Sequence, residues 1–201
     1  MIALILLVIL TVLAFYKDSL IRKHSVKLYS IFTVLAVLAL LKSDMVIFKP
    51  IIQGFMGLAL FYLVMIAGAL PKSKLQKKLM SIRREYSIIG FIVITPHGLH
   101  YILEAINGER SLAILGVIAY AIMIPLFITS FKAVRKKMTI HTWRKLQSAA
   151  YVVYILLSIH LLLNYTLTIN LVLYIVLFGV YYLLKAKKEF MKSKKKVLLK
   201  S

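Results

Sequence analysis

The sequence predicts an all-α, polytopic membrane helix bundle. Hydrophobic residues make up 62% of the 201 residues, whereas a soluble domain has roughly 45–50%. These residues are grouped in blocks, and several blocks approach the ~20 residues that cross a hydrocarbon core. The lysines and arginines lie mostly between the blocks. Together, these observations predict a multi-pass protein of the cell membrane.

Seven apolar segments predict about seven spans. They are Ile2–Tyr16, Leu28–Leu41, Ile51–Leu70, Tyr86–Ile106, Leu112–Phe131, Leu146–Tyr165 and Leu167–Leu184. The first two are short, and one of them is alternatively a tilted or interfacial helix. Pro71 suits the end of the third segment, since proline does not continue a helix. Pro96 and Pro125 lie inside segments, where membrane helices tolerate a kink, and Asn107-Gly108 predicts a tight turn.

The charges predict an orientation with the N-terminus outside and the C-terminus inside. Of the 27 lysines and arginines, 24 fall in alternate connections and in the C-terminal tail. The positive-inside rule places those regions in the cytoplasm. The first segment lacks a basic region before it and a small-residue cleavage site after it, so we expect a retained helix. The net charge of +21 is typical of nucleic-acid binding, but its placement favours a topology signal and no nucleic-acid partner.

The residue types also limit the cofactors. The chain has no cysteine, which excludes disulfides, thiolate-held iron–sulfur clusters and thioether-attached haem. A metal centre must therefore use histidine, methionine or oxygen ligands. The sequence shows no glycine-rich dinucleotide fingerprint after a strand, so we expect no nicotinamide-binding domain within it.

Three histidines lie inside apolar segments, where an ionisable group indicates a functional site. His97 lies 13 positions after Arg84, and His160 lies 15 positions after Lys145. At ~1.5 Å per residue, both lie ~20–22 Å from the cytoplasmic boundary. Two imidazoles at one level, on helices that run in the same direction, predict the axial ligands of a haem iron. The alternative is a hydrogen bond between helices. His100 is another candidate ligand, a propionate partner or a plain polar residue.

The chain resembles the ferric reductase-like transmembrane domain family in three ordered stretches. These are "RREYSIIGFIVITPHGLHY", "IPLFITSFKAVRKK" and "TWRKLQSAAYVVYILLSIH". The landmarks that match are Arg83, Arg84, His97, Thr129, Ser130, Trp143, Leu146 and His160. The stretch Gly54–Pro71 resembles the helix before the paired arginines. Within the family, the chain resembles haem-binding membrane subunits that supply electrons to a periplasmic methionine sulfoxide reductase.

The resemblance covers about residues 50–185 and implies a six-helix core preceded by an extra N-terminal helix. It divides the chain into N-terminal membrane helices (1–45), a haem-binding transmembrane core (46–185) and a basic cytoplasmic tail (186–201). The tail is a topology anchor or a segment that contacts lipid headgroups.

The function that the resemblance implies is electron transfer by a b-type haem protein. Electrons would pass from a quinol or flavin donor to an acceptor at the outer face, with the chain acting as a subunit of a reductase system. His97 and His160 would ligate the iron, and His100, Gln147, Arg83 and Arg84 would make secondary contacts. FMN or a quinone is a further candidate cofactor. Membrane lipid, an extracytoplasmic reductase and a flavoprotein donor are the candidate partners.

One residue departs from the family pattern. Gln147 stands where the family has a histidine after Trp-x-x-Leu, and an amide is a poor iron ligand. We therefore expect one haem b and not two. The competing hypothesis is a non-redox transport or scaffold protein on the same fold that has lost haem, in which the histidines and Glu104 form a proton or cation pathway.

Overall fold

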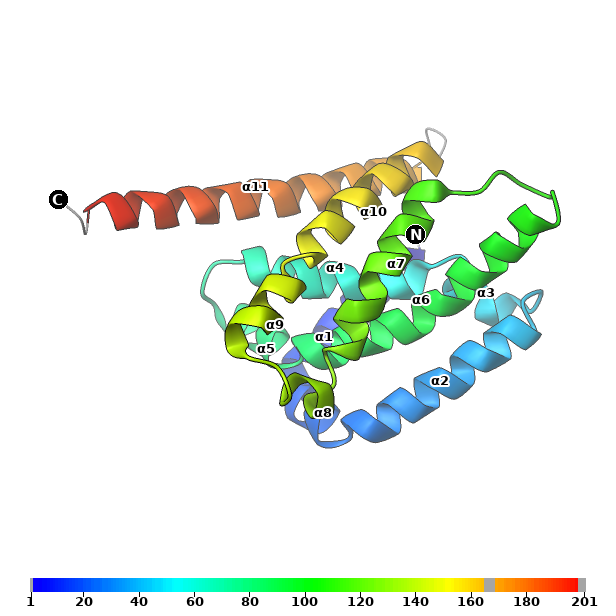
Figure 1. The fold of residues 1–201 in the computed structure, drawn as a ribbon, viewed down its shortest axis with the longest axis horizontal. Coiled ribbons are helices and arrows are strands. Elements are labelled where there is room, and N and C mark those ends of the chain that lie inside the picture. Colours follow the sequence, from blue (N-terminus) through cyan, green and yellow to red (C-terminus); the bar gives the residue numbers. More distant parts are fainter. Residues whose placement is uncertain (1, 165–168, 199–201) are drawn as a thin grey trace.

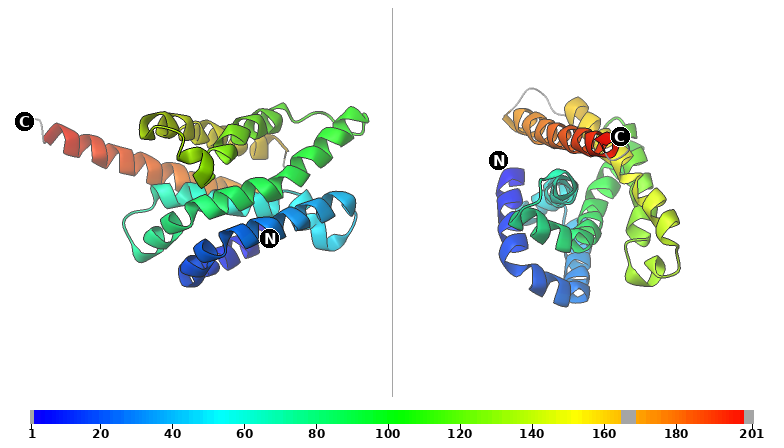
Figure 2. Two further views of the ribbon diagram at one scale, coloured as in Figure 1. Left: turned by 60° about the horizontal axis from the view of Figure 1, so that its bottom comes forward. Right: turned by 90° about the vertical axis from the view of Figure 1, so that its left-hand side faces the viewer.

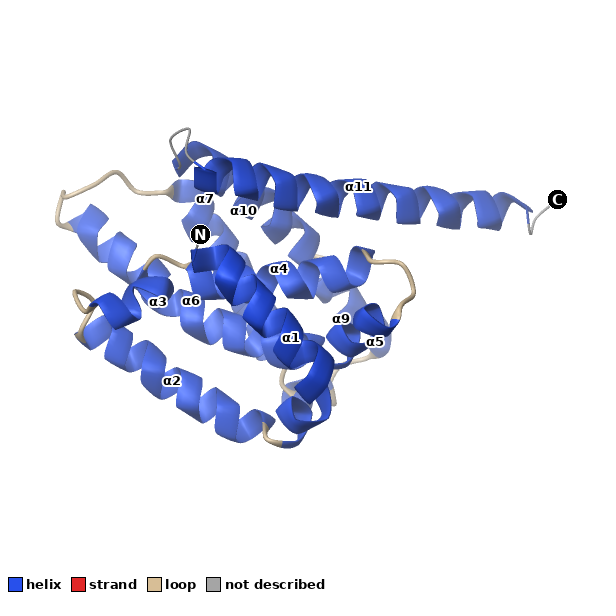
Figure 3. Cartoon of the chain, turned by 180° about the vertical axis from the view of Figure 1, so that it is seen from behind, coloured by secondary structure: helices blue, strands red, loops and turns tan. Residues whose placement is uncertain are grey.

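The computed structural model describes residues 2–164 and 169–198, and every regular element in this part is helical (Figure 3). This confirms the predicted all-α fold. The helices are α1 (Ile2–Lys23), α2 (Ser25–Leu41), α3 (Lys49–Ile52), α4 (Phe55–Ala69), α5 (Lys74–Ser81), α6 (Arg83–Ile106), α7 (Ile114–Ile128), α8 (Lys132–Arg135), α9 (Ile140–Gln147), α10 (Ala150–Asn164) and α11 (Ile169–Leu198), with a 3₁₀ turn at Val46–Phe48. The start of the seventh predicted segment at Leu167 and the end of the sixth at Tyr165 lie outside the described residues.

Within the described residues, four helical stretches are long and apolar enough to cross a membrane. They are α1, α6, the pair α9–α10 and most of α11. The bent pair formed by Val46–Ile52 and α4 provides a fifth. Two further apolar helices, α2 and α7, are shorter. These helices support the predicted membrane protein, while the count of seven spans stays a prediction.

Five helices form a closed ring of contacts. Helix α4 packs against α6, α6 against α7, α7 against α10, α10 against α11, and α11 against α4 (Figures 1 and 2). Helix α4 lies deepest, with most of its side chains buried. Helices α1 and α2 lie outside the ring, α1 against α4 and α5, and α2 against α6.

Buried tyrosines join these layers through polar contacts. The hydroxyl of Tyr62 on α4 donates to the carbonyl of Leu177 on α11 at 3.0 Å. The hydroxyl of Tyr86 on α6 donates to the carbonyl of Leu10 on α1 at 2.7 Å. Such bonds between helices stabilise membrane bundles because lipid offers the hydroxyl no partner.

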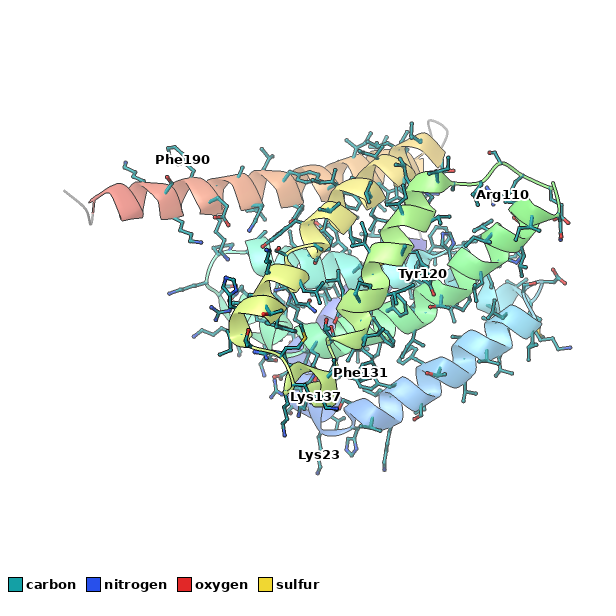
Figure 4. All side chains as sticks on the ribbon, viewed as in Figure 1. Lys23, Arg110, Tyr120, Phe131, Lys137 and Phe190 are labelled. Atoms are coloured by element: carbon teal, nitrogen blue, oxygen red, sulfur yellow. The ribbon has the colours of Figure 1, made fainter. Side chains whose placement is uncertain are left out.

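The connections that are rich in lysine and arginine gather at one end of the bundle, here called the inner end. Asp18 on α1 pairs there with Lys78 on α5, and the Lys188 ammonium on α11 donates to the carbonyl of Gly68 on α4 at 2.7 Å. Figure 4 shows Lys23 and Lys137 near this end and Arg110 at the opposite, outer end. The arrangement agrees with the alternation predicted from the charges.

The third predicted segment, Ile51–Leu70, forms two helices and not one continuous helix. The chain breaks at Gln53 and Gly54, and the two parts are bent by 42°. Gly54 has a φ of 78°, a left-handed conformation that glycine adopts without a Cβ clash. The predicted end is confirmed, because α4 stops at Ala69 before Pro71.

The prolines inside helices and the turn at Gly108 are as predicted, but the sixth predicted segment is not one continuous helix. Pro96 and Pro125 lie inside α6 and α7, and Gly108 turns the chain after α6 with a φ of 78°. The sixth predicted segment is interrupted at Ser148 and Ala149. There the amide of Tyr151 bonds to the carbonyl of Ser148, three residues back, in the tighter 3₁₀ manner.

Candidate haem site

His97 of α6 is held by the break between α3 and α4. Its Nδ1 lies 2.9 Å from the carbonyl oxygen of Ile52, the last residue of α3. A carbonyl only accepts, so Nδ1 carries the proton and Nε2 keeps a free lone pair. This contact between a ring N–H and a backbone carbonyl is the one that orients metal-binding histidines. The interruption of the predicted third segment therefore has a direct consequence for the site.

His160 of α10 has a different partner. The amide nitrogen of Asn164 donates to the backbone oxygen of His160 at 2.7 Å and lies 3.2 Å from Nδ1. Since an amide N–H donates, this contact favours a His160 ring with its proton on Nε2. Iron binding through Nε2 requires that proton to move to Nδ1 and the Asn164 amide to turn away. The two histidines are thus not equivalent, because only His97 is already in the ligating form.

A glycine from another helix lies against each of these imidazoles. A Cβ placed on Gly54 would come within 3.1 Å of Nδ1 of His97, and one placed on Gly116 of α7 within 3.0 Å of Cε1 of His160. Both distances are shorter than ordinary van der Waals contact, so any side chain at either position would press on a ring. Sequence reasoning missed both glycines, although an isolated glycine in an apolar helix is itself a signal of close packing.

His100 points into a polar cluster at the outer end of α6. Its Nε2 lies 3.1 Å from Oε1 of Glu104, and the Arg110 guanidinium lies 3.2 Å from the other oxygen of the same carboxylate. The guanidinium also stacks on the ring of Tyr101, 4.1 Å from the centroid. His100 is therefore engaged by Glu104 in this structure.

Arg110 is the charged residue that sequence reasoning did not assign to the site. Arg110 lies close enough to His97 and His160 for its positive charge to act on both imidazoles. His97 and His160 are also close enough to each other to interact electrostatically. The turn at Asn107-Gly108 brings Arg110 back over the end of α6. The turn itself was predicted, but the position of the guanidinium depends on the path of the chain into α7.

Gln147 lies at the inner end, bonded to α7. Its amide nitrogen donates to the carbonyl of Leu126 at 3.2 Å and to the hydroxyl oxygen of Thr129 at 3.1 Å. The indole N–H of Trp143 donates to the carbonyl of Thr129 at 3.1 Å. These sequence landmarks thus join α9 to the end of α7.

The paired arginines also lie at the inner end, at the start of α6. Arg83 lies beside the phenol of Tyr154, and Arg84 pairs with the buried carboxylate of Glu85. The structure therefore separates the predicted residues into an outer group of His97, His100 and His160 and an inner group of Gln147, Arg83 and Arg84. His141 is exposed on α9.

The imidazoles of His97 and His160 are the candidate axial ligands of a haem. No group of three or more histidine, cysteine, aspartate or glutamate side chains suitable for an ion occurs within residues 2–164 and 169–198. A haem brings the ring nitrogens that hold its iron and needs only axial ligands from the protein. The two outer histidines, each facing a glycine, fit that requirement.

Comparison with known proteins identifies one family. The model described as "Ferric reductase like transmembrane component" matches residues 53–158. This range contains His97 and Gln147 and ends two residues before His160. No solved structure is detectably similar to the chain.

Two curated relatives are similar to parts of the chain. An uncharacterized protein of Treponema pallidum is 31% identical over 169 residues, which cover 74% of this chain and 47% of that protein. Magnetosome protein MamZ of Paramagnetospirillum magneticum is 34% identical over 97 residues, which cover 43% of this chain and 15% of that protein. The chain therefore spans less than half the length of either relative.

Proposed function

Because the chain belongs to the ferric reductase-like transmembrane family, we propose that it is a membrane electron-transfer protein that holds one haem b between His97 and His160. The family assignment indicates electron transfer in a membrane. The main observation in favour of haem binding is the hydrogen bond from Nδ1 of His97 to the Ile52 carbonyl. This bond leaves Nε2 free to bind iron. His160 on α10 of the same ring of helices is the second ligand.

Each residue of the outer site has a role in this proposal. The haem supplies a one-electron couple when it is bound. The Ile52 carbonyl fixes the tautomer and plane of the His97 ring. Gly54 and Gly116 leave the two imidazoles in place without pressure from a side chain. Arg110 brings a positive charge to the outer side of the pair, where it is placed to interact with an anionic propionate.

Two features of the inner half of the bundle favour one haem over two in this proposal. Gln147 uses its amide to join α9 to α7, and nearby aromatic rings pack the interface between α6 and α7. Phe127 stacks on Phe91 with centroids 4.3 Å apart, and Phe131 packs on Phe127 at 5.0 Å. Apolar rings and a satisfied amide offer no axial ligand to an iron.

The proposal includes a direction of electron flow, from an inner donor to an outer acceptor. Electrons enter from a quinol or flavin donor, with FMN or a quinone as the candidate carrier, and leave at the outer face. Partners in this scheme are a flavoprotein donor and an extracytoplasmic reductase. The alternative is a non-redox transport or scaffold protein that has lost haem on the same fold.

The haem content of the purified full chain tests the proposal. We expect a dithionite-reduced minus oxidised spectrum with sharp b-type bands, and a pyridine haemochrome assay that gives about one haem per chain. A chain that stays free of haem after expression with excess haem supply would rule out the electron-transfer role and favour the alternative. Two haems per chain would contradict the assignment of Gln147.

Replacement of Arg110 by glutamine is expected to lower the midpoint potential of the haem. A nearby positive charge favours the reduced iron, which carries one positive charge fewer than the oxidised iron. Its removal should shift the potential downward on the order of tens of millivolts, measured by optical redox titration. Arg110→Lys keeps the charge and should stay near the wild-type value. An upward shift in Arg110→Gln would contradict the position proposed for the haem.

A further inference from the structure

A cavity of about 540 Å³ lies at the inner end, away from the histidine pair. Four elements line it: the end of α1, helix α5, the start of α6 and α8. Its size is that of a small-ligand site, for which ≈ 300–1,000 Å³ is usual. Neither the haem site nor the electron path proposed above uses it.

The cavity is strongly basic. Its lining includes Arg22, Lys23, Arg84 and Lys132, against one carboxylate, Glu85. Arg84 pairs with Glu85, and Arg22 shares Asp18 with Lys78 outside the cavity. In the described part of the chain, Lys23 and Lys132 take part in no ion pair. The site therefore has two ammonium groups to offer to an anionic ligand.

The cations of the cavity lie where apolar segments end, which is the level expected for lipid headgroups. Each of its cations lies a few residues from the end of an apolar segment: Arg22 and Lys23 after Tyr16, Lys132 directly after Phe131, and Arg84 two residues before Tyr86. These boundaries mark the edge of the hydrocarbon core. Met80, which is 41% exposed, gives the lining an apolar side chain next to the charges.

We propose that this cavity binds the phosphate headgroup of an anionic phospholipid of the inner leaflet. Lys23 and Lys132 contact the phosphate, Arg22 and Arg84 add positive charge, and the hydroxyls of Ser19 and Ser81 lie in the same lining. A bound lipid would join the α1 end, outside the ring of helices, to α6 and α8. The chemistry that is recognised is a phosphodiester with a net negative charge, as in phosphatidylglycerol.

Native mass spectrometry of the full chain tests this site. The chain is purified with an equal mixture of phosphatidylglycerol and phosphatidylcholine, and the lipid that stays bound is counted. We expect selective retention of phosphatidylglycerol, and a roughly thirtyfold loss in the double variant Lys23→Gln/Lys132→Gln, since two lost phosphate contacts of about 1 kcal/mol each correspond to that factor. Excess inorganic phosphate should not displace the lipid.

A matched double variant distinguishes lipid binding in the cavity from non-specific binding to a basic surface. Lys27→Gln/Lys136→Gln removes the same charge from exposed positions at the same end, outside the cavity, and should keep the lipid. Equal loss in both double variants, equal retention of the two lipids, or displacement by inorganic phosphate would each overturn the proposal. Haem is counted in the same samples. Because the cavity and the histidine pair are separate, failure of either assignment is seen without the other.

Discussion

Substitution of His97 by alanine is expected to remove the b-type bands of the reduced-minus-oxidised spectrum. The mutation deletes the one ligand whose tautomer is already set, through the bond to Ile52 at 2.9 Å. His160→Ala should also remove the low-spin bands. It should leave more residual haem than His97→Ala, however, because the better-oriented ligand remains. We expect a loss of haem affinity of at least about tenfold in each variant, measured by haem titration of the purified apoprotein.

Two other histidines provide controls for this experiment. His100→Ala lies three residues from His97, and its ring is engaged by Glu104. His141→Ala lies on the exposed face of α9. Both should keep the bands of the unmodified protein. Loss of the bands in His100→Ala with retention in His97→Ala would make His100 the ligand.

The second large effect is expected at Gly54. Gly54→Ala places a methyl group within 3.1 Å of the His97 ring, so the ring must move away from the Ile52 carbonyl. The substitution also strains a backbone with φ of 78°, at a cost of about 1–2 kcal/mol. We expect a fall in haem affinity of roughly tenfold together with a lower melting temperature.

Gly108 separates these two causes. It has the same φ of 78°, and nothing lies within 4 Å of a Cβ placed there. Gly108→Ala should therefore carry the backbone strain and leave haem affinity unchanged. If both alanine variants lose haem to the same degree, the effect comes from strain, and the contact with His97 has no part in it.

Most of the fold could be predicted from the sequence because its signals are local. Apolar runs of membrane length and the distribution of basic residues are properties of the chain itself. They predicted the helical class and the connections that share one end, and the common level of His97 and His160 stays a prediction. Pro71 and Asn107-Gly108 fixed two helix ends for the same reason, since their backbone restrictions need no partner.

The sequence did not predict how the site is assembled, because that depends on residues far apart in the chain. An apolar run from Ile51 to Leu70 gives no sign that its helix breaks at Gly54, or that the Ile52 carbonyl there meets a ring 45 residues later. Gly116 contacts His160 only because α7 packs against α10. Arg110 lies near the histidines only because the chain turns back after α6 into α7. Composition and spacing thus determined a membrane helix bundle and predicted two histidines at one depth. The tertiary structure alone decided which carbonyl, glycine and guanidinium surround them, because hydrogen bonds and close packing join groups that the order of the sequence keeps apart.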